Sequence, residues 1–211
     1  MPSEAGPFRY RAGVNPGFDG REYVVRQKIT PIANVYSVFA GHDGDAGMLA
    51  YVRQKRLKLK EEILFYSDKS REQLLLRVKA RKVLDLGSRY DVTDGNGQRI
   101  GVIGKAFGAS LTRSTWTVFD PSESVEVLRF TERNLAVALF RRIWNFIPYA
   151  GDLPFMIRYH FDGTAGDRVV VTYDKITRFR DHYRLTLVEA PPVDVRVLFA
   201  LAITLDALQR R

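Results

Sequence analysis

Val193-Asp-Val-Arg-Val-Leu-Phe-Ala-Leu-Ala-Ile-Thr-Leu-Asp-Ala-Leu208, near the end of the chain, predicts a helix with apolar residues on every face. Only nine uncharged residues separate Arg196 from Asp206, whereas a membrane-spanning helix needs about 20. The segment is therefore too apolar for a surface helix and too short to cross a bilayer. We expect protein to surround it on all sides, with Pro191-Pro192 before it and Asp194 near its positive N-terminal pole.

Most of the chain before this helix has the pattern of short β-strands separated by turns. β-branched and aromatic residues dominate the segments 23–28, 34–39, 48–53, 155–160, 168–173 and 183–188. Turn-like clusters recur about every 26 residues, at His42-Asp-Gly44, Asp68-Lys-Ser70, Asp94-Gly-Asn-Gly97 and Asp120-Pro-Ser-Glu123. This pattern predicts a chain of hairpins, and together with the apolar helix it suggests a sheet closed around a central helix.

Two other segments depart from the strand pattern. Residues 131–147 have apolar side chains at helical spacing and are followed by Pro148, which predicts a second helix. That helix would cap the barrel or, because Arg141, Arg142 and Trp144 lie among its apolar residues, rest on a membrane interface. Residues 1–20 are rich in Pro and Gly, so we expect a flexible leader there and a single barrel domain over 21–211.

The composition excludes several classes of active site. The 211 residues include no cysteine, which excludes disulfides, thiolate metal sites and cysteine nucleophiles. His42, His160 and His182 are far apart in the sequence, and Gly104-Lys105 lacks the residues of a phosphate-binding loop. We therefore expect no catalytic residues, no metal site and no cofactor; an enzyme whose groups converge only in space is the last-ranked alternative. The N-terminus has no apolar run typical of a signal peptide, so a cytoplasmic location is the default.

The net formal charge of +9 is concentrated in one region. Residues 53–82 hold eleven Lys and Arg against four Asp and Glu, a local charge of +7. Leu76, Val78 and Ala80 alternate with cations, so a strand there would present aliphatic side chains on one face and cations on the other. Such a field favours an anionic partner, although a solvated basic face that only keeps the protein soluble has the same pattern. The candidate anionic lipid-binding residues are Arg53, Lys55, Arg56, Lys58, Lys60, Arg77, Lys79 and Arg81.

Several segments resemble a known superfamily. Asp194–Asp206 resembles the terminal helix of phospholipid scramblases and of LURP-one-related proteins, which share the tubby-like fold. Lys58–Asp68, Val78-Lys-Ala-Arg81, Tyr90–Asp94 and Thr115-Trp116 resemble segments of a bacterial branch of that superfamily. The resemblance implies a mainly β fold, a roughly twelve-stranded antiparallel closed barrel around a buried hydrophobic C-terminal helix. Where scramblases would carry an acidic calcium segment, this chain has the basic stretch 178–184, which argues against calcium-triggered scrambling.

These observations favour a non-enzymatic tubby-like domain that binds anionic phospholipid head groups as a peripheral protein at the cytosolic membrane surface. One alternative is a nucleic-acid-associated module that uses the same charge, although aromatic residues are not interleaved with the cations as in single-strand binding platforms. Another is a protein-interaction scaffold in which the charge is incidental.

Overall fold

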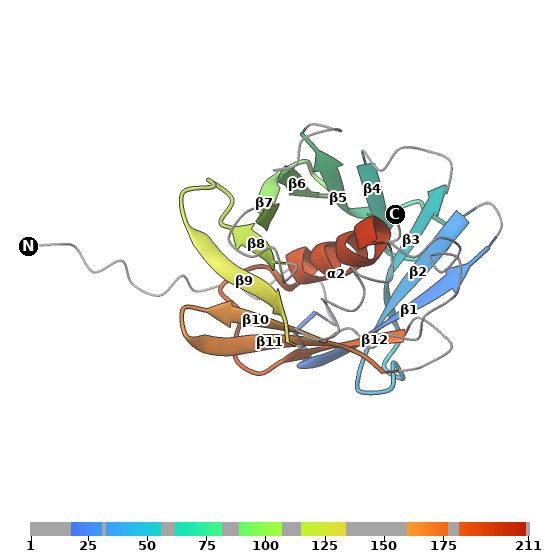
Figure 1. Ribbon diagram of the computed structural model, residues 1–211. Helices are drawn as coiled ribbons and strands as arrows, with labels where there is room; N and C mark the ends of the chain where they lie inside the picture. The colour runs from blue at the N-terminus through green and yellow to red at the C-terminus, as the bar shows by residue number, and fades with distance from the viewer. Residues whose placement is uncertain are drawn as a thin grey trace, which may run out of the picture.

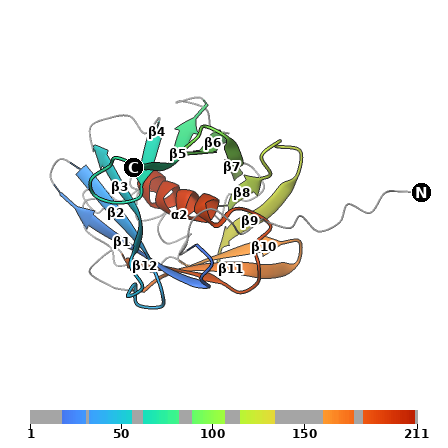
Figure 2. The same cartoon turned by 180° about the vertical axis from the view of Figure 1, so that it is seen from behind.

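The computed structural model describes residues 18–30, 33–55, 62–81, 89–106, 115–133, 160–176 and 182–209. Within these residues, twelve antiparallel strands form a closed barrel, and the helix α2 (Val195–Gln209) lies inside the ring of strands (Figures 1 and 2). Each strand pairs with the next one in sequence, and β12 closes the barrel by pairing with β1, where Glu22 lies opposite Thr186. The predicted fold class is confirmed. The strands are β1 (Glu22–Ile29), β2 (Ala33–Ala40), β3 (Met48–Lys55), β4 (Glu62–Tyr66), β5 (Leu74–Ala80), β6 (Arg89–Asp94), β7 (Arg99–Ala106), β8 (Thr115–Phe119), β9 (Glu126–Glu132), β10 (His160–Ala165), β11 (Arg168–Lys175) and β12 (His182–Leu187).

The four predicted turn clusters all join paired strands. They lie between β2 and β3, β4 and β5, β6 and β7, and β8 and β9. In the turn before β7, Oδ1 of Asp94 accepts hydrogen bonds of 2.9 Å from the amides of Asn96 and Gln98. Gly97 has a φ of 84°, which a residue without a Cβ adopts at no steric cost. The chain of hairpins is therefore confirmed at these turns, and the chemistry of the turn residues explains why.

The helix α2 supplies the centre of the core. Nine consecutive residues, from Val197 to Leu205, are each at most 2% exposed, so no face of the helix meets solvent over two and a half turns. The ring of Phe199 packs edge-on against Tyr23, with ring centroids 5.0 Å apart. Gly101 on β7 leaves room for the helix, because a Cβ there would lie 3.1 Å from Cγ2 of Val197. The predicted burial of this segment is confirmed.

Asp194 fixes the start of α2. Its Oδ1 accepts a 2.8 Å hydrogen bond from the amide of Arg196, and its carboxylate forms an ion pair with the Arg196 guanidinium. The amide of Val197 donates to the Asp194 carbonyl at 2.9 Å. Asp194 is therefore the N-cap, which satisfies a helix donor that would otherwise be buried without a partner.

The predicted helix 131–147 and the predicted strand 155–160 differ from the structure where they meet the described residues. Thr131 and Glu132, predicted as the start of a helix over 131–147, belong to β9; pairing of Glu132 with Phe161 overrides any local helical preference. Residues 134–147 lie outside the described part of the chain. The predicted strand 155–160 meets the described residues only at His160, where β10 begins. Residues 161–165 of β10 were missed because Asp162 and Gly163 disfavour strands.

Residues 1–17 of the predicted leader also lie outside the described part of the chain. Phe18, within the predicted leader, packs its ring against Phe199 with centroids 5.8 Å apart. In the described residues, no helix has both the length and the apolarity required to cross a membrane.

The burial of α2 predicts the effect of truncating one of its side chains. Leu198 is 1% exposed, so Leu198→Ala should lower the free energy of unfolding by about 2 to 5 kcal/mol. Val188→Ala is the control: this side chain is 48% exposed and its truncation should change stability by less than about 0.5 kcal/mol. Urea denaturation measures both. Equal, small effects would contradict the central position of the helix.

The contact of Gly163 with Phe130 predicts a second stability effect. These residues are cross-strand partners, and a Cβ on Gly163 would lie 2.6 Å from Cζ of Phe130. Gly163→Ala should therefore overpack the core and cost about 1 to 3 kcal/mol. Replacing the ring with the smaller side chain of leucine in Phe130→Leu should relieve the clash, so the double variant should be more stable than the sum of the two single changes predicts. Strict additivity in thermal unfolding would contradict this contact.

Candidate anion-binding face

The predicted basic residues that can be placed lie together on the outside of the barrel. Leu76 and Val78 of β5 are 1% exposed and face the core, whereas Arg77 and Lys79 are exposed on the outer side, as their alternation predicts. Arg53 is exposed on β3, and Arg81 follows β5 directly. The side chain of Lys55, at the end of β3, and all of Arg56, Lys58 and Lys60 lie outside the described part of the chain.

Carboxylates already neutralise part of this basic face. Nε of Arg77 lies 3.2 Å from Oε1 of Glu62 on the neighbouring β4. Arg81 also forms ion pairs, described below. Within the described ranges, by contrast, Arg53 and Lys79 form no ion pair, so an external anion can reach them without displacing a described carboxylate. Of the four predicted cations whose side chains the structure describes, these two are the most available.

The structure also brings two tyrosines to this face. Tyr51 on β3 lies directly opposite Tyr66 on β4, and both are partly exposed. Leu64, two residues before Tyr66, lies opposite Arg77. The sequence showed no aromatic residues interleaved with the cations, because Tyr51 and Tyr66 join them only through strand pairing. The register of the two hairpins was the signal that would have found them. Half-buried tyrosines beside arginines are the composition that lipid–water interfaces favour.

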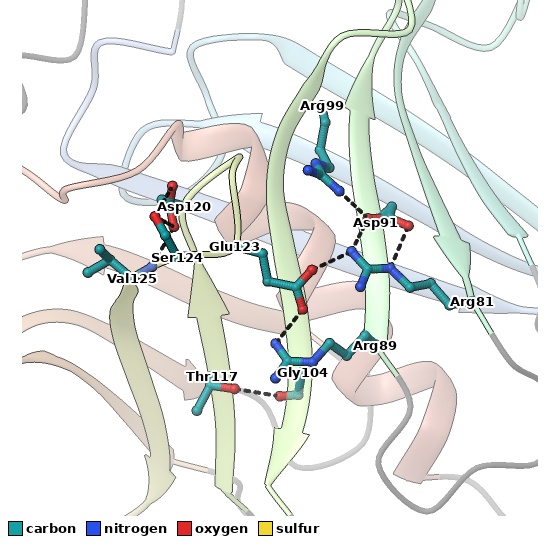
Figure 3. A network of polar contacts seen from close by, with 10 residues as sticks. All are labelled: Arg81, Arg89, Asp91, Arg99, Gly104, Thr117, Asp120, Glu123, Ser124 and Val125. Atoms are coloured by element: carbon teal, nitrogen blue, oxygen red, sulfur yellow. Dashed lines mark hydrogen bonds and ion pairs between the residues drawn. The ribbon is translucent and has the colours of Figure 1, made fainter.

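Farther along the outer wall, two arginines converge on one glutamate. Nη2 of Arg81 lies 2.7 Å from Oε2 of Glu123, and Nη1 of Arg89 lies 2.8 Å from Oε1 of the same carboxylate (Figure 3). Arg81 also forms two hydrogen bonds to Asp91, of 2.9 and 2.7 Å. The hydrogen bonds that Arg81 donates to Asp91 and then to Glu123 raise the pKa of Arg81 above its ordinary value, and the hydrogen bond from Arg81 lowers the pKa of Asp91. The sequence pointed to Arg81 but missed Arg89 and Glu123, which approach it only in the folded chain.

The loop between β8 and β9 presents Glu123 to these arginines. The Asp120 carboxylate organises the loop by accepting hydrogen bonds from the hydroxyl and amide of Ser122 and from the amide of Val125, the last at 2.7 Å. These hydrogen bonds hold the pKa of Asp120 at about 2. Glu123 has a φ of 65°, in the left-handed region that non-glycine residues rarely adopt. Figure 3 shows the Glu123 side chain extending from this loop across β7 toward Arg81 and Arg89.

Packing beneath the loop positions Arg89. Its guanidinium carbon lies 4.2 Å from the centre of the Phe119 ring, a cation–π contact. A Cβ on Gly104 would make ordinary contacts with Phe119 at 3.4 Å and Arg89 at 4.0 Å, but it would lie only 3.0 Å from Oγ1 of Thr117, which would have to shift. Val102 alternates with the inward-facing Gly101 and so points outward, yet it is completely buried. Val102 is thus an apolar residue shielded from solvent on the outer wall, between its strand partners Asp91 and Phe119.

The other candidate motifs occupy structural positions. His42 contacts Glu22 at 2.8 Å, His160 contacts Asp174 at 2.7 Å, and His182 lies on β12. Gly104-Lys105 lies within β7, not at a strand-to-helix turn. Among the described residues, no three His, Asp or Glu side chains gather where they could hold a metal ion.

Comparison with known proteins shows which family this chain matches. The model of the LURP-one-related family matches residues 48–206, from the start of β3 to α2. No curated protein matches. The crystal structure of a protein from Arabidopsis thaliana covers 93% of this chain and 97% of its own, with a TM-score of 0.48 and 13% sequence identity. The family match spans well over half of the sequence and confirms the resemblance stated above. This chain therefore belongs to the LURP-one-related family, within the tubby-like superfamily.

Proposed function

We propose that this protein is a non-enzymatic binding module that docks reversibly on anionic phospholipid surfaces through the outer face of β3, β4 and β5. The observation that carries the proposal is the placement of Arg53, Arg77 and Lys79 on one face, beside the facing tyrosines of β3 and β4. The membership of a tubby-like family supports a lipid-binding or related role at a coarse level.

The energetics favour reversible, peripheral binding. Each cation near an anionic bilayer contributes on the order of 1 kcal/mol, so a few cations acting together give useful but salt-sensitive affinity. The side chains of Tyr51 and Tyr66 add apolar contact at the depth of the head groups. Carboxylates such as Glu62 reduce the charge of this face, which limits purely electrostatic attraction to any polyanion. The tyrosines therefore favour a lipid surface over nucleic acid.

Charge reversal tests this face. Arg53→Glu combined with Lys79→Glu should lower the affinity for vesicles of phosphatidylcholine and phosphatidylserine by about tenfold or more, because two attractive contacts become repulsive. Neither change breaks a described ion pair. Vesicle co-sedimentation at several salt concentrations measures the affinity, and wild-type binding should weaken as the Debye length falls from about 10 Å at 0.1 M.

The matched control is Arg21→Glu with Lys69→Glu. Both side chains are exposed, neither makes a described ion pair, and the net charge changes by the same amount. This control should bind vesicles like the wild type. Failure of the wild type to bind at low salt, equal loss in the control, or tighter binding to duplex DNA at the same ionic strength would each refute the proposal.

A further inference from the structure

The Glu123 site has the form of an anion-binding site that the protein fills with its own carboxylate. Arg81 directly follows β5 and Arg89 is the first residue of β6, and their guanidinium groups point at the two oxygens of one carboxylate (Figure 3). Arg99 joins the cluster through Asp91, whose Oδ1 lies 3.5 Å from Nη1 of Arg99. Paired guanidinium groups are the donors that bind phosphate oxygens best in proteins. We propose that Arg81 and Arg89 form a binding site for a phosphomonoester group, which Glu123 occupies until such a group displaces it.

The backbone of Glu123 supports this assignment. A φ of 65° is strained for any residue with a Cβ, and a glycine would adopt it freely. The chain nevertheless holds a glutamate there, with its carboxylate on the two arginines. The ion pairs with the two arginines offset this strain. When another group displaces the carboxylate, nothing offsets the strain and the loop is free to adopt another conformation.

The carboxylate also satisfies the two arginines unequally. Nη1 of Arg89 is buried and lies 2.8 Å from Glu123, but the group is not aligned to donate a hydrogen bond, and Nη1 has no hydrogen-bond partner. A planar carboxylate presents two oxygens, whereas a phosphomonoester presents three that point in different directions. The tetrahedral group can therefore satisfy Arg89 while it keeps the contact with Arg81.

The charges of the cluster match a phosphomonoester. Arg81, Arg89 and Arg99 face the carboxylates of Asp91 and Glu123, a net charge of +1. Removing Glu123 from the site leaves +2, which complements the charge of about −2 that a phosphomonoester approaches at neutral pH. Asp91 stays in place, because Arg81 binds it through two hydrogen bonds.

This site goes beyond the proposed membrane docking and does not require it. Arg89 and Glu123 lie outside the β3–β5 face, and inorganic phosphate tests the site without a membrane. The single variant Arg53→Glu changes no residue of the site and no strand partner of one, so it should weaken vesicle binding but keep its affinity for phosphate. Failure of one proposal is therefore separable from failure of the other.

The experiment is calorimetric titration of the full chain with inorganic phosphate at constant ionic strength. Glu123→Gln should bind phosphate about tenfold more tightly than the wild type, because the competing charge is gone. Glu123→Gly is the second variant; it also removes the carboxylate and, because glycine tolerates the left-handed backbone, keeps the loop foldable. Glu126→Gln is the matched control, since Glu126 carries the same charge nearby but pairs with Arg129.

The gain should disappear when Arg89→Gln is added to Glu123→Gln. Vesicles with phosphatidic acid, a phosphomonoester, and with phosphatidylglycerol, a phosphodiester, identify the source of the group. A gain with both phosphate and phosphatidic acid supports a lipid head group, and a gain with phosphate alone supports a soluble ligand. The proposal is overturned if both folded Glu123 variants bind phosphate no better than the wild type, or if Glu126→Gln gains equally.

Discussion

The requirement to bury α2 on all sides determines the rest of the structure. A helix with one apolar stripe can rest against an open sheet, but Val197 to Leu205 have no side that tolerates water. Only a wall that surrounds the helix satisfies this requirement, and closing the sheet also pairs every strand edge. The small residue Gly101 and the edge-on contact of Phe199 with Tyr23 show how the wall fits the helix closely. Because the helix fills the centre of the barrel, the candidate binding features described here lie on the outer wall.

The sequence predicted the features that depend on local patterns. The all-round apolar helix, the hairpin turns built on Asp94 and Gly97, and the alternation of Arg77 with Leu76 and Val78 were all readable, because each follows from a periodicity or from turn chemistry. The prediction that was wrong concerned residues whose structure depends on long-range strand pairing. Thr131 and Glu132 join a strand because β10 lies beside them, and no local signal reveals that neighbour.

The candidate site was predictable only in part for the same reason. The cations near β5 stood out through their density in the sequence. Their neutralising partners did not, since Glu123 is more than 40 residues from Arg81 and its side chain reaches that arginine from the loop between β8 and β9, across β7. The tyrosines of β3 and β4 likewise join the basic face only through the register of their pairing. A count of charges therefore overstates how many cations are available to a partner.

A second loop on the outer wall shows why it matters that Glu123 offers its arginine a charged carboxylate. The loop between β2 and β3 is held in a related way: Arg26 lies 4.6 Å from the ring centre of Phe39 and donates a 2.6 Å hydrogen bond to the carbonyl of Asp43. Nearby Val24 is 2% exposed, like the covered Val102 of the other site. Both loops thus use an arginine stacked on a phenylalanine.

They differ in the acceptor that the stacked arginine meets. A backbone carbonyl is neutral, so an incoming anion that takes its place on Arg26 adds charge and leaves the carbonyl to find another donor. At Arg89 the partner is an anion held by an ion pair, and exchange of a carboxylate for a phosphoryl group keeps every guanidinium beside a negative charge. The two loops therefore share their packing but differ in the charge of the group that the arginine meets. Because one anion can replace another at Arg89 without a change in pairing, the loop between β8 and β9 is the better candidate to respond to a ligand.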